Sequence, residues 1–166
     1  MEDIARPLNK RGQKAAKLVG RWLEAEGIRP ALVLCSSARR TRETLDLIQE
    51  AIGSRVPIQI EPDLYLADAP TILARLRKIP RDVPSALVIA HNPGLQEFVG
   101  ELIAAPGAAS SASRERLDKK FPTGALARFR LKIEDWRALT PDAPVGTIKL
   151  LGVTTPADLG AGKDRD

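Results

Sequence analysis

The stretch Leu87-Val88-Ile89-Ala90-His91-Asn92-Pro93-Gly94 decides how the rest of this chain is interpreted. Four apolar residues, then His91 and Asn-Pro-Gly, predict a short buried strand that ends in a turn. Beyond the turn, apolar residues recur at the spacing of an amphipathic helix, namely Leu95, Phe98, Val99, Leu102 and Ile103. His91 is the only histidine of the sequence. It therefore lies where a strand passes into a helix, close to amide groups that favour anions.

Helices and strands are predicted to alternate along the whole chain. A first helix begins after Asn9 as its N-cap, buries a stripe of apolar side chains and ends near Gly27. That predicted stripe consists of Ala15, Leu18, Val19 and Trp22. The other predicted elements are a strand at 31–35, a helix with Leu45, Ile48 and Ile52 inside, a strand at 57–60, a helix capped by Asp68, and strands at 123–131 and 147–153. Residues 104–120 are predicted to be a mobile loop, and residues 154–166 a disordered polar tail.

This alternation predicts one three-layer α/β/α domain, residues 1–153, around a mainly parallel sheet. In such sheets, ligands bind beyond the carboxyl ends of the strands. Ser36–Arg40 and His91–Gly94 both follow predicted strands. We therefore expect the two stretches to form one pocket.

Composition and charge favour an ordinary globular protein. The chain has 43% apolar and 28% charged residues and no apolar run of membrane-spanning length. Its net charge of +5 is spread over several places without a groove-reading motif, so nucleic-acid binding is not expected. A single Cys35 excludes an internal disulfide and agrees with a cytoplasmic location.

Arg40 and His91 are the candidate anion ligands. A guanidinium at the start of a helix can hold two oxygens of a phosphoryl group, and a histidine beside it can bind the same group. Each residue also has a simpler interpretation, Arg40 as a surface residue and His91 as a hydrogen-bonded structural residue. Cys35 closes an apolar strand and is interpreted as a buried small side chain rather than a nucleophile.

Four segments resemble the histidine phosphatase superfamily, most closely its small SixA-type branch of phosphohistidine phosphatases. They are Pro7–Gly12, Ser36–Thr44, Val88–Gly94 and Phe121–Ala125. The resemblance implies a phosphoglycerate-mutase-like fold, no metal or cofactor, and a phosphorylated substrate such as a phosphohistidine protein or another phosphomonoester. It implies phosphate contacts for Arg40, His91 and Asn92, with His91 as the second, supporting catalytic histidine. Asp68 is the nearest candidate for the acid that many members use, although its N-cap role explains it without catalysis.

The sequence departs from the family at the nucleophile. The family's nucleophilic histidine lies in an Arg-His motif on a first, central strand, which would precede Pro7, and only six residues do so here. We therefore expect the chain as written to lack that strand and the nucleophile, and to be inactive alone. An absent central strand would leave two sheet edges open to self-association.

Three functions remain open. The chain belongs to a phosphatase whose coding sequence starts further upstream, or it binds phosphate without hydrolysis, or it is an interaction module. In the third case the basic face of the first helix, formed by Lys10, Lys14, Lys17 and Arg21, meets an acidic partner.

Overall fold

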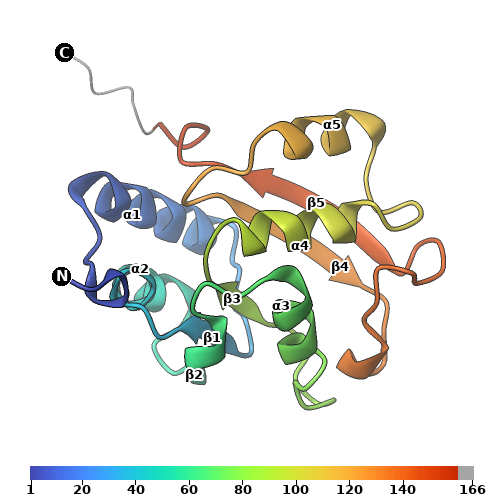
Figure 1. The fold of residues 1–166 in the computed structure, drawn as a ribbon, viewed down its shortest axis with the longest axis horizontal. Coiled ribbons are helices and arrows are strands. Elements are labelled where there is room, and N and C mark those ends of the chain that lie inside the picture. Colours follow the sequence, from blue (N-terminus) through green and yellow to red (C-terminus); the bar gives the residue numbers. More distant parts are fainter. Residues whose placement is uncertain (161–166) are drawn as a thin grey trace. The chain divides into compact units, whose positions relative to one another are not determined.

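The computed structural model describes residues 1–160, and its ribbon is drawn in Figure 1. The pattern of contacts divides the chain into two compact units. Met1–Tyr65, Val83–Ala90 and the segment from Thr154 form the first unit. Leu66–Asp82 and His91–Val153 form the second unit.

A parallel sheet organises the first unit. Its strands are β1 (Val33–Ser36), β2 (Ile58–Glu61) and β3 (Leu87–Ile89), in the order β2-β1-β3. Cys35 of β1 lies opposite Ile60 of β2 and Ile89 of β3. All four residues of β1 are completely buried, as expected for the middle strand of a covered sheet. The three predicted strands are therefore confirmed, with bounds shifted by one or two residues.

Two helices, α1 (Lys10–Ala25) and α2 (Arg39–Ile52), pack on each other in the same unit. They approach closely at Gly20, where a Cβ atom would lie 3.5 Å from the Cα of Ile48. Asn9 is the N-cap of α1, as predicted, because its side chain accepts a hydrogen bond from the Gly12 amide at 2.8 Å. Two short 3₁₀ turns complete the unit, η1 (Asp3–Ala5) and η2 (Pro62–Leu64).

The buried stripe of α1 differs from the prediction by a small rotation about the helix axis. The buried residues are Ala15, Ala16, Val19, Gly20 and Leu23. Leu18 and Trp22 are only half-buried. The close approach at Gly20 explains the difference, because it turns the face that carries this small residue toward α2.

The second unit contains the remaining elements. They are α3 (Ala69–Leu76), α4 (Gly94–Ile103), α5 (Ser111–Lys119), β4 (Leu126–Leu131), the 3₁₀ turn η3 (Trp136–Ala138) and β5 (Ile148–Thr154). β4 and β5 pair as a two-stranded sheet and run in opposite directions in Figure 1. This pair confirms the predicted C-terminal strands. Asp68 is the N-cap of α3, also as predicted.

The prediction of a mobile loop at 104–120 is wrong, because this segment contains α5. Ser110 is the N-cap of α5, and its hydroxyl accepts a hydrogen bond from the Ser113 amide at 3.1 Å. Leu117 is buried in a core cluster with Val99, Ile103 and Phe121. One buried leucine in a polar helix leaves a weak apolar period, which is why composition alone indicated a loop.

The structure confirms the predicted α/β class with a parallel sheet. After β5, Thr155 and Asp158 close a turn through two reciprocal hydrogen bonds. Residues 161–166, the rest of the predicted disordered tail, lie outside the described part. Among residues 1–160, none of the helices is long and apolar enough to cross a membrane.

Candidate functional site

The turn between β1 and α2 positions Arg40. Ser36 ends β1, and its buried hydroxyl accepts a hydrogen bond from the Ala38 amide at 3.3 Å. The Thr41 hydroxyl lies 2.9 Å from the carbonyl oxygens of both Ser36 and Ala38. These buried contacts fix the first turn of α2, and Arg40 projects from it.

Arg40 holds an anionic group of its own chain. Its Nη1 donates to the carbonyl oxygen of Asp3 at 3.0 Å, and its Nη2 lies 3.3 Å from the Oδ2 of Asp3. The Arg40 side chain is 21% exposed. The partly buried guanidinium therefore presents two nitrogens to oxygen atoms, which is the arrangement that binds carboxylate or phosphate.

Asp3 has two further partners. Arg6 Nη2 lies 2.7 Å from its Oδ1, and the Tyr65 hydroxyl donates to its Oδ2. The hydrogen bond from Tyr65, and then the charges of Arg40 and Arg6, hold the pKa of Asp3 below its usual value. The same hydrogen bond raises the pKa of Tyr65. Asp3 is therefore ionised at neutral pH and sits within a polar cluster of Asp3, Arg6, Arg40 and Tyr65, here called the Asp3 cluster.

Glu43 joins two of the segments that resemble the phosphatase family. One carboxylate oxygen accepts a hydrogen bond from the Leu8 amide at 2.7 Å, and the other lies 2.7 Å from Nε of Arg39. The bond from Leu8 is the main reason why the pKa of Glu43 lies below its usual value. Glu43 thus ties the start of the Pro7–Gly12 segment to α2.

His91 belongs to the second unit and follows β3 by two residues. It is buried, and its carbonyl oxygen accepts the Leu95 amide at 2.9 Å at the start of α4. Asn92 donates from Nδ2 to the carbonyl oxygen of Phe121 at 2.9 Å. This bond ties the His91 turn to the Phe121–Ala125 segment, so Asn92 helps to position the turn.

Gly94 allows α4 to begin close to Asp68. A Cβ at Gly94 would lie 1.8 Å from the carbonyl oxygen of Ala67 and 3.4 Å from the Cα of Asp68. Only glycine permits this approach. The structure therefore brings the candidate acid Asp68 next to the segment that carries His91.

Asp68 itself is engaged as a helix cap. Its Oδ1 accepts a hydrogen bond from the Thr71 amide at 2.9 Å. Hydrogen bonds from the Thr71 side chain and backbone lower its pKa. A general acid needs a carboxyl group with a raised pKa, so this environment supports the capping role.

Cys35 lies in the middle of β1 and is completely buried. Burial raises the pKa of its thiol to about 11. A thiol in this state is a poor nucleophile, as the sequence indicated.

The site residues are divided between the two units. The first unit holds Arg40, and the second holds His91, Asn92 and Asp68. A pocket shared by Arg40 and His91 would need residues from both units, and it stays a prediction. No three His, Cys, Asp or Glu side chains among residues 1–160 are grouped so that they could hold a metal ion.

Sequence reasoning did not single out Asp3, Tyr65 or Glu43 as partners of these segments. Tyr65 is 62 positions from Asp3, and Arg40 is 37 positions from it. No periodicity links residues so far apart, and the place of Arg40 at the start of a helix predicts an anion beside it without indicating that Asp3 supplies one.

Comparison with known proteins supports the resemblance. The family model of the histidine phosphatase superfamily (branch 1) matches residues 3–70. An uncharacterized protein of Mycobacterium tuberculosis is 32% identical over 93% of this chain and 91% of its own length. The phosphohistidine phosphatase SixA of Escherichia coli is 28% identical over 60% of this chain and 63% of its own length.

Solved structures extend the similarity to nearly the whole chain. A putative phosphohistidine phosphatase SixA from Nakamurella has a TM-score of 0.78 and 28% identity, over 94% of this chain and 88% of that one. A protein histidine phosphatase SixA complexed with tungstate has a TM-score of 0.71 and 25% identity, over 95% of this chain and 89% of that one.

Proposed function

Since this chain belongs to the histidine phosphatase superfamily, we propose that it binds the phosphoryl group of a phosphohistidine protein, or of another phosphomonoester, through Arg40 and His91. The assignment of a phosphorylated protein as the substrate follows the SixA relatives. Arg40 supplies a permanent charge and two donors, and His91 acts as the supporting histidine. A fixed positive group such as the Arg40 guanidinium stabilises the charge on the oxygens of a transferring phosphoryl group.

The observation that carries this proposal is the contact between Arg40 and Asp3. Arg40 already faces two oxygens of an acidic residue at 3.0 and 3.3 Å. A phosphoryl group offers oxygens of similar geometry and greater charge, so it competes for the same nitrogens. The tungstate complex of the similar SixA structure supports an oxyanion site in this fold.

Turnover is a separate matter from binding. In the family mechanism, a nucleophilic histidine accepts the phosphoryl group before water does. The sequence contains one histidine, and the proposal gives His91 the supporting role. We therefore expect the chain as written to bind phosphate without hydrolysing phosphomonoesters.

Ligand-dependent unfolding tests the binding proposal. Phosphate or vanadate at a hundredfold excess over Kd should raise the free energy of unfolding by about 2.7 kcal/mol. Arg40→Ala should abolish this gain. Arg42→Ala is the matched control, because it removes an exposed arginine from the same helix and should keep the gain. A gain that survives in Arg40→Ala would contradict the proposal.

Activity assays test the expectation of no turnover. p-Nitrophenyl phosphate and a phosphohistidine peptide should both remain intact. Turnover that is lost in His91→Ala and kept in Cys35→Ser would overturn the supporting role given to His91.

We also propose that copies of this chain associate through a sheet edge. β2 is an edge strand of the parallel sheet, and its Ile60 is 45% exposed. An exposed apolar side chain on an edge strand favours pairing with another strand. Sedimentation should show concentration-dependent dimers that Ile60→Lys dissociates, and a monomer at every concentration would contradict this.

A further inference from the structure

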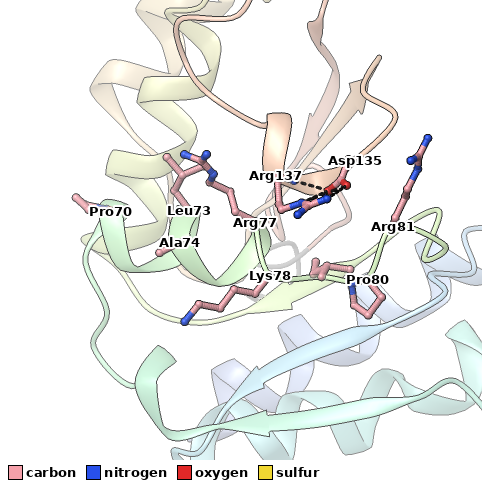
Figure 2. Close-up of a pocket in the computed structure, with 10 residues that line it drawn as sticks. Pro70, Leu73, Ala74, Arg77, Lys78, Pro80, Arg81, Asp135 and Arg137 are labelled. Atoms are coloured by element: carbon pink, nitrogen blue, oxygen red, sulfur yellow. Dashed lines mark hydrogen bonds and ion pairs between the residues drawn. The ribbon is translucent and has the colours of Figure 1, made fainter.

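A groove on the second unit is lined by residues outside the four sequence motifs Pro7–Gly12, Ser36–Thr44, Val88–Gly94 and Phe121–Ala125. It has a volume of about 760 Å³ and lies between α3, with the turn that follows it, and the segment that leads into η3 (Figure 2). Its apolar lining comes from Pro70, Leu73, Ala74, Ile79 and Pro80. This volume is within the range of ligand-binding clefts, and we call it the α3 groove.

The charges around the α3 groove are mostly positive. Four basic side chains line it, Arg77, Lys78, Arg81 and Arg137, against the single carboxylate of Asp135. Arg137 neutralises that carboxylate, because its Nε and Nη2 lie 2.9 to 3.3 Å from the two oxygens. Beyond this pair the lining carries three further positive charges, those of Arg77, Lys78 and Arg81.

One acidic side chain of the chain itself already approaches this surface. Glu134 Oε2 lies 3.7 Å from Nη2 of Arg81, and the two side chains are 93% and 69% exposed. Such a long, exposed ion pair is weak and is screened by water. Neither Arg77 nor Lys78 has an ion pair among residues 1–160. A carboxylate is therefore favourable at this surface, and Arg77 and Lys78 can pair with further carboxylates.

The arrangement suits a protein segment better than a small anion or a nucleic acid. Figure 2 shows the charged ends of Arg77, Lys78 and Arg81 pointing in different directions rather than toward one point. A single phosphate could not engage them together. No aromatic side chain lines the groove to stack on bases. Apolar groups between separated cations match a chain in which acidic and apolar side chains follow one another.

We propose that the α3 groove is a docking site for an acidic segment of a partner protein, in which Asp or Glu residues flank apolar side chains. The carboxylates pair with Arg77, Lys78 and Arg81, and the apolar side chains cover Leu73 and Pro80. This site goes beyond the proposed phosphate binding, because none of its residues belongs to the Asp3 cluster or to the His91 turn.

Fluorescence anisotropy with a labelled peptide, in which Asp and Glu flank leucines, tests the proposal. The double variant Arg77→Glu/Lys78→Glu should weaken binding at least about tenfold. Its matched control is Lys10→Glu/Lys17→Glu, which makes the same charge change at exposed positions of α1 and should leave binding unchanged. Equal weakening in both variants would overturn the proposal, because only overall charge would then matter.

Further measurements separate the alternatives. Ala74→Glu places a negative charge at an exposed position of the α3 groove and should also weaken binding while the protein stays folded. A peptide with serines in place of leucines should bind more weakly, and equal binding would contradict the apolar contacts. A single-stranded oligonucleotide is the test for a nucleic-acid surface. If it binds as tightly as the peptide, and if Arg77→Glu/Lys78→Glu abolishes its binding, the groove is a nucleic-acid surface instead. The phosphate-induced gain in stability should persist in Arg77→Glu/Lys78→Glu, so failure of one proposal is distinguishable from failure of the other.

Discussion

Asp3 contacts the guanidinium of Arg40 with both its backbone and its side chain. The carbonyl oxygen lies 3.0 Å from Nη1, and the carboxylate Oδ2 lies 3.3 Å from Nη2. An incoming phosphoryl group must therefore displace Asp3, at least in part, before it reaches Arg40. The affinity for phosphate therefore depends on how strongly Asp3 competes for the Arg40 guanidinium.

Asp3→Ala should increase the affinity for phosphate roughly threefold to tenfold, because it removes a negative charge that competes for Arg40. Isothermal titration of phosphate or vanadate into both proteins measures the change. Glu2→Ala is the control for the loss of one negative charge near the N-terminus, and it should alter the affinity much less. Weaker binding by Asp3→Ala would mean that Asp3 positions Arg40 rather than competing with phosphate.

Glu43 should make stability depend on pH in the acidic range. Its pKa in the folded protein lies below the ordinary value of 4.5, so the folded state binds fewer protons than the unfolded state. The resulting stabilisation is fully present above that value and is lost as pH falls through the lower, folded pKa. Urea unfolding at a series of acidic pH values should therefore show a smaller loss of stability in Glu43→Gln than in the unchanged protein.

Glu50→Gln is the control for this experiment. Glu50 is exposed on the same helix, and replacing it should leave the acid dependence nearly unchanged. If both variants reduce the loss of stability at acidic pH equally, the hydrogen bond from the Leu8 amide to Glu43 does not cause the acid dependence.

The Cys35 thiol should resist alkylation in the folded protein. A pKa raised from 9.0 to about 11 lowers the thiolate fraction about a hundredfold, and complete burial blocks the reagent further. Iodoacetamide labelling followed by mass spectrometry should therefore be at least about a hundredfold slower in buffer than in urea. Rapid labelling under native conditions would reopen Cys35 as a reactive group.

The elements that could be predicted from the sequence carry strong local signals. Asn9 and Asp68 are good N-caps with apolar periods behind them, and both caps are present. The apolar run that contains Cys35 forms β1, the middle strand of the parallel sheet. α5 was missed because Leu117 is its only buried residue, and the exact stripe of α1 depended on packing at Gly20 rather than on its own sequence.

The candidate site was less predictable, because its contacts connect distant parts of the chain. The place of Arg40 after a strand predicts an anion ligand there, but nothing local in the sequence links Arg40 to its partner Asp3. The same holds for the bond from Asn92 to Phe121, which gives a predicted phosphate ligand a positioning role. The shared pocket of Arg40 and His91 and the cytoplasmic location stay predictions.

Gly94→Ala should destabilise the protein by about 3 kcal/mol or more, because the new methyl group would lie 1.8 Å from the Ala67 carbonyl oxygen. The Ala67 carbonyl oxygen is part of the backbone and cannot rotate away as a flexible side chain does. The start of α4 would therefore have to move away from Asp68. Gly100→Ala is a strict control in the same helix, since nothing lies within 4 Å of its Cβ. It should be stabilising by roughly 0.5 to 1 kcal/mol through helix propensity. Urea unfolding measures both, and a near-neutral Gly94→Ala would contradict the close approach that brings Asp68 next to the His91 segment.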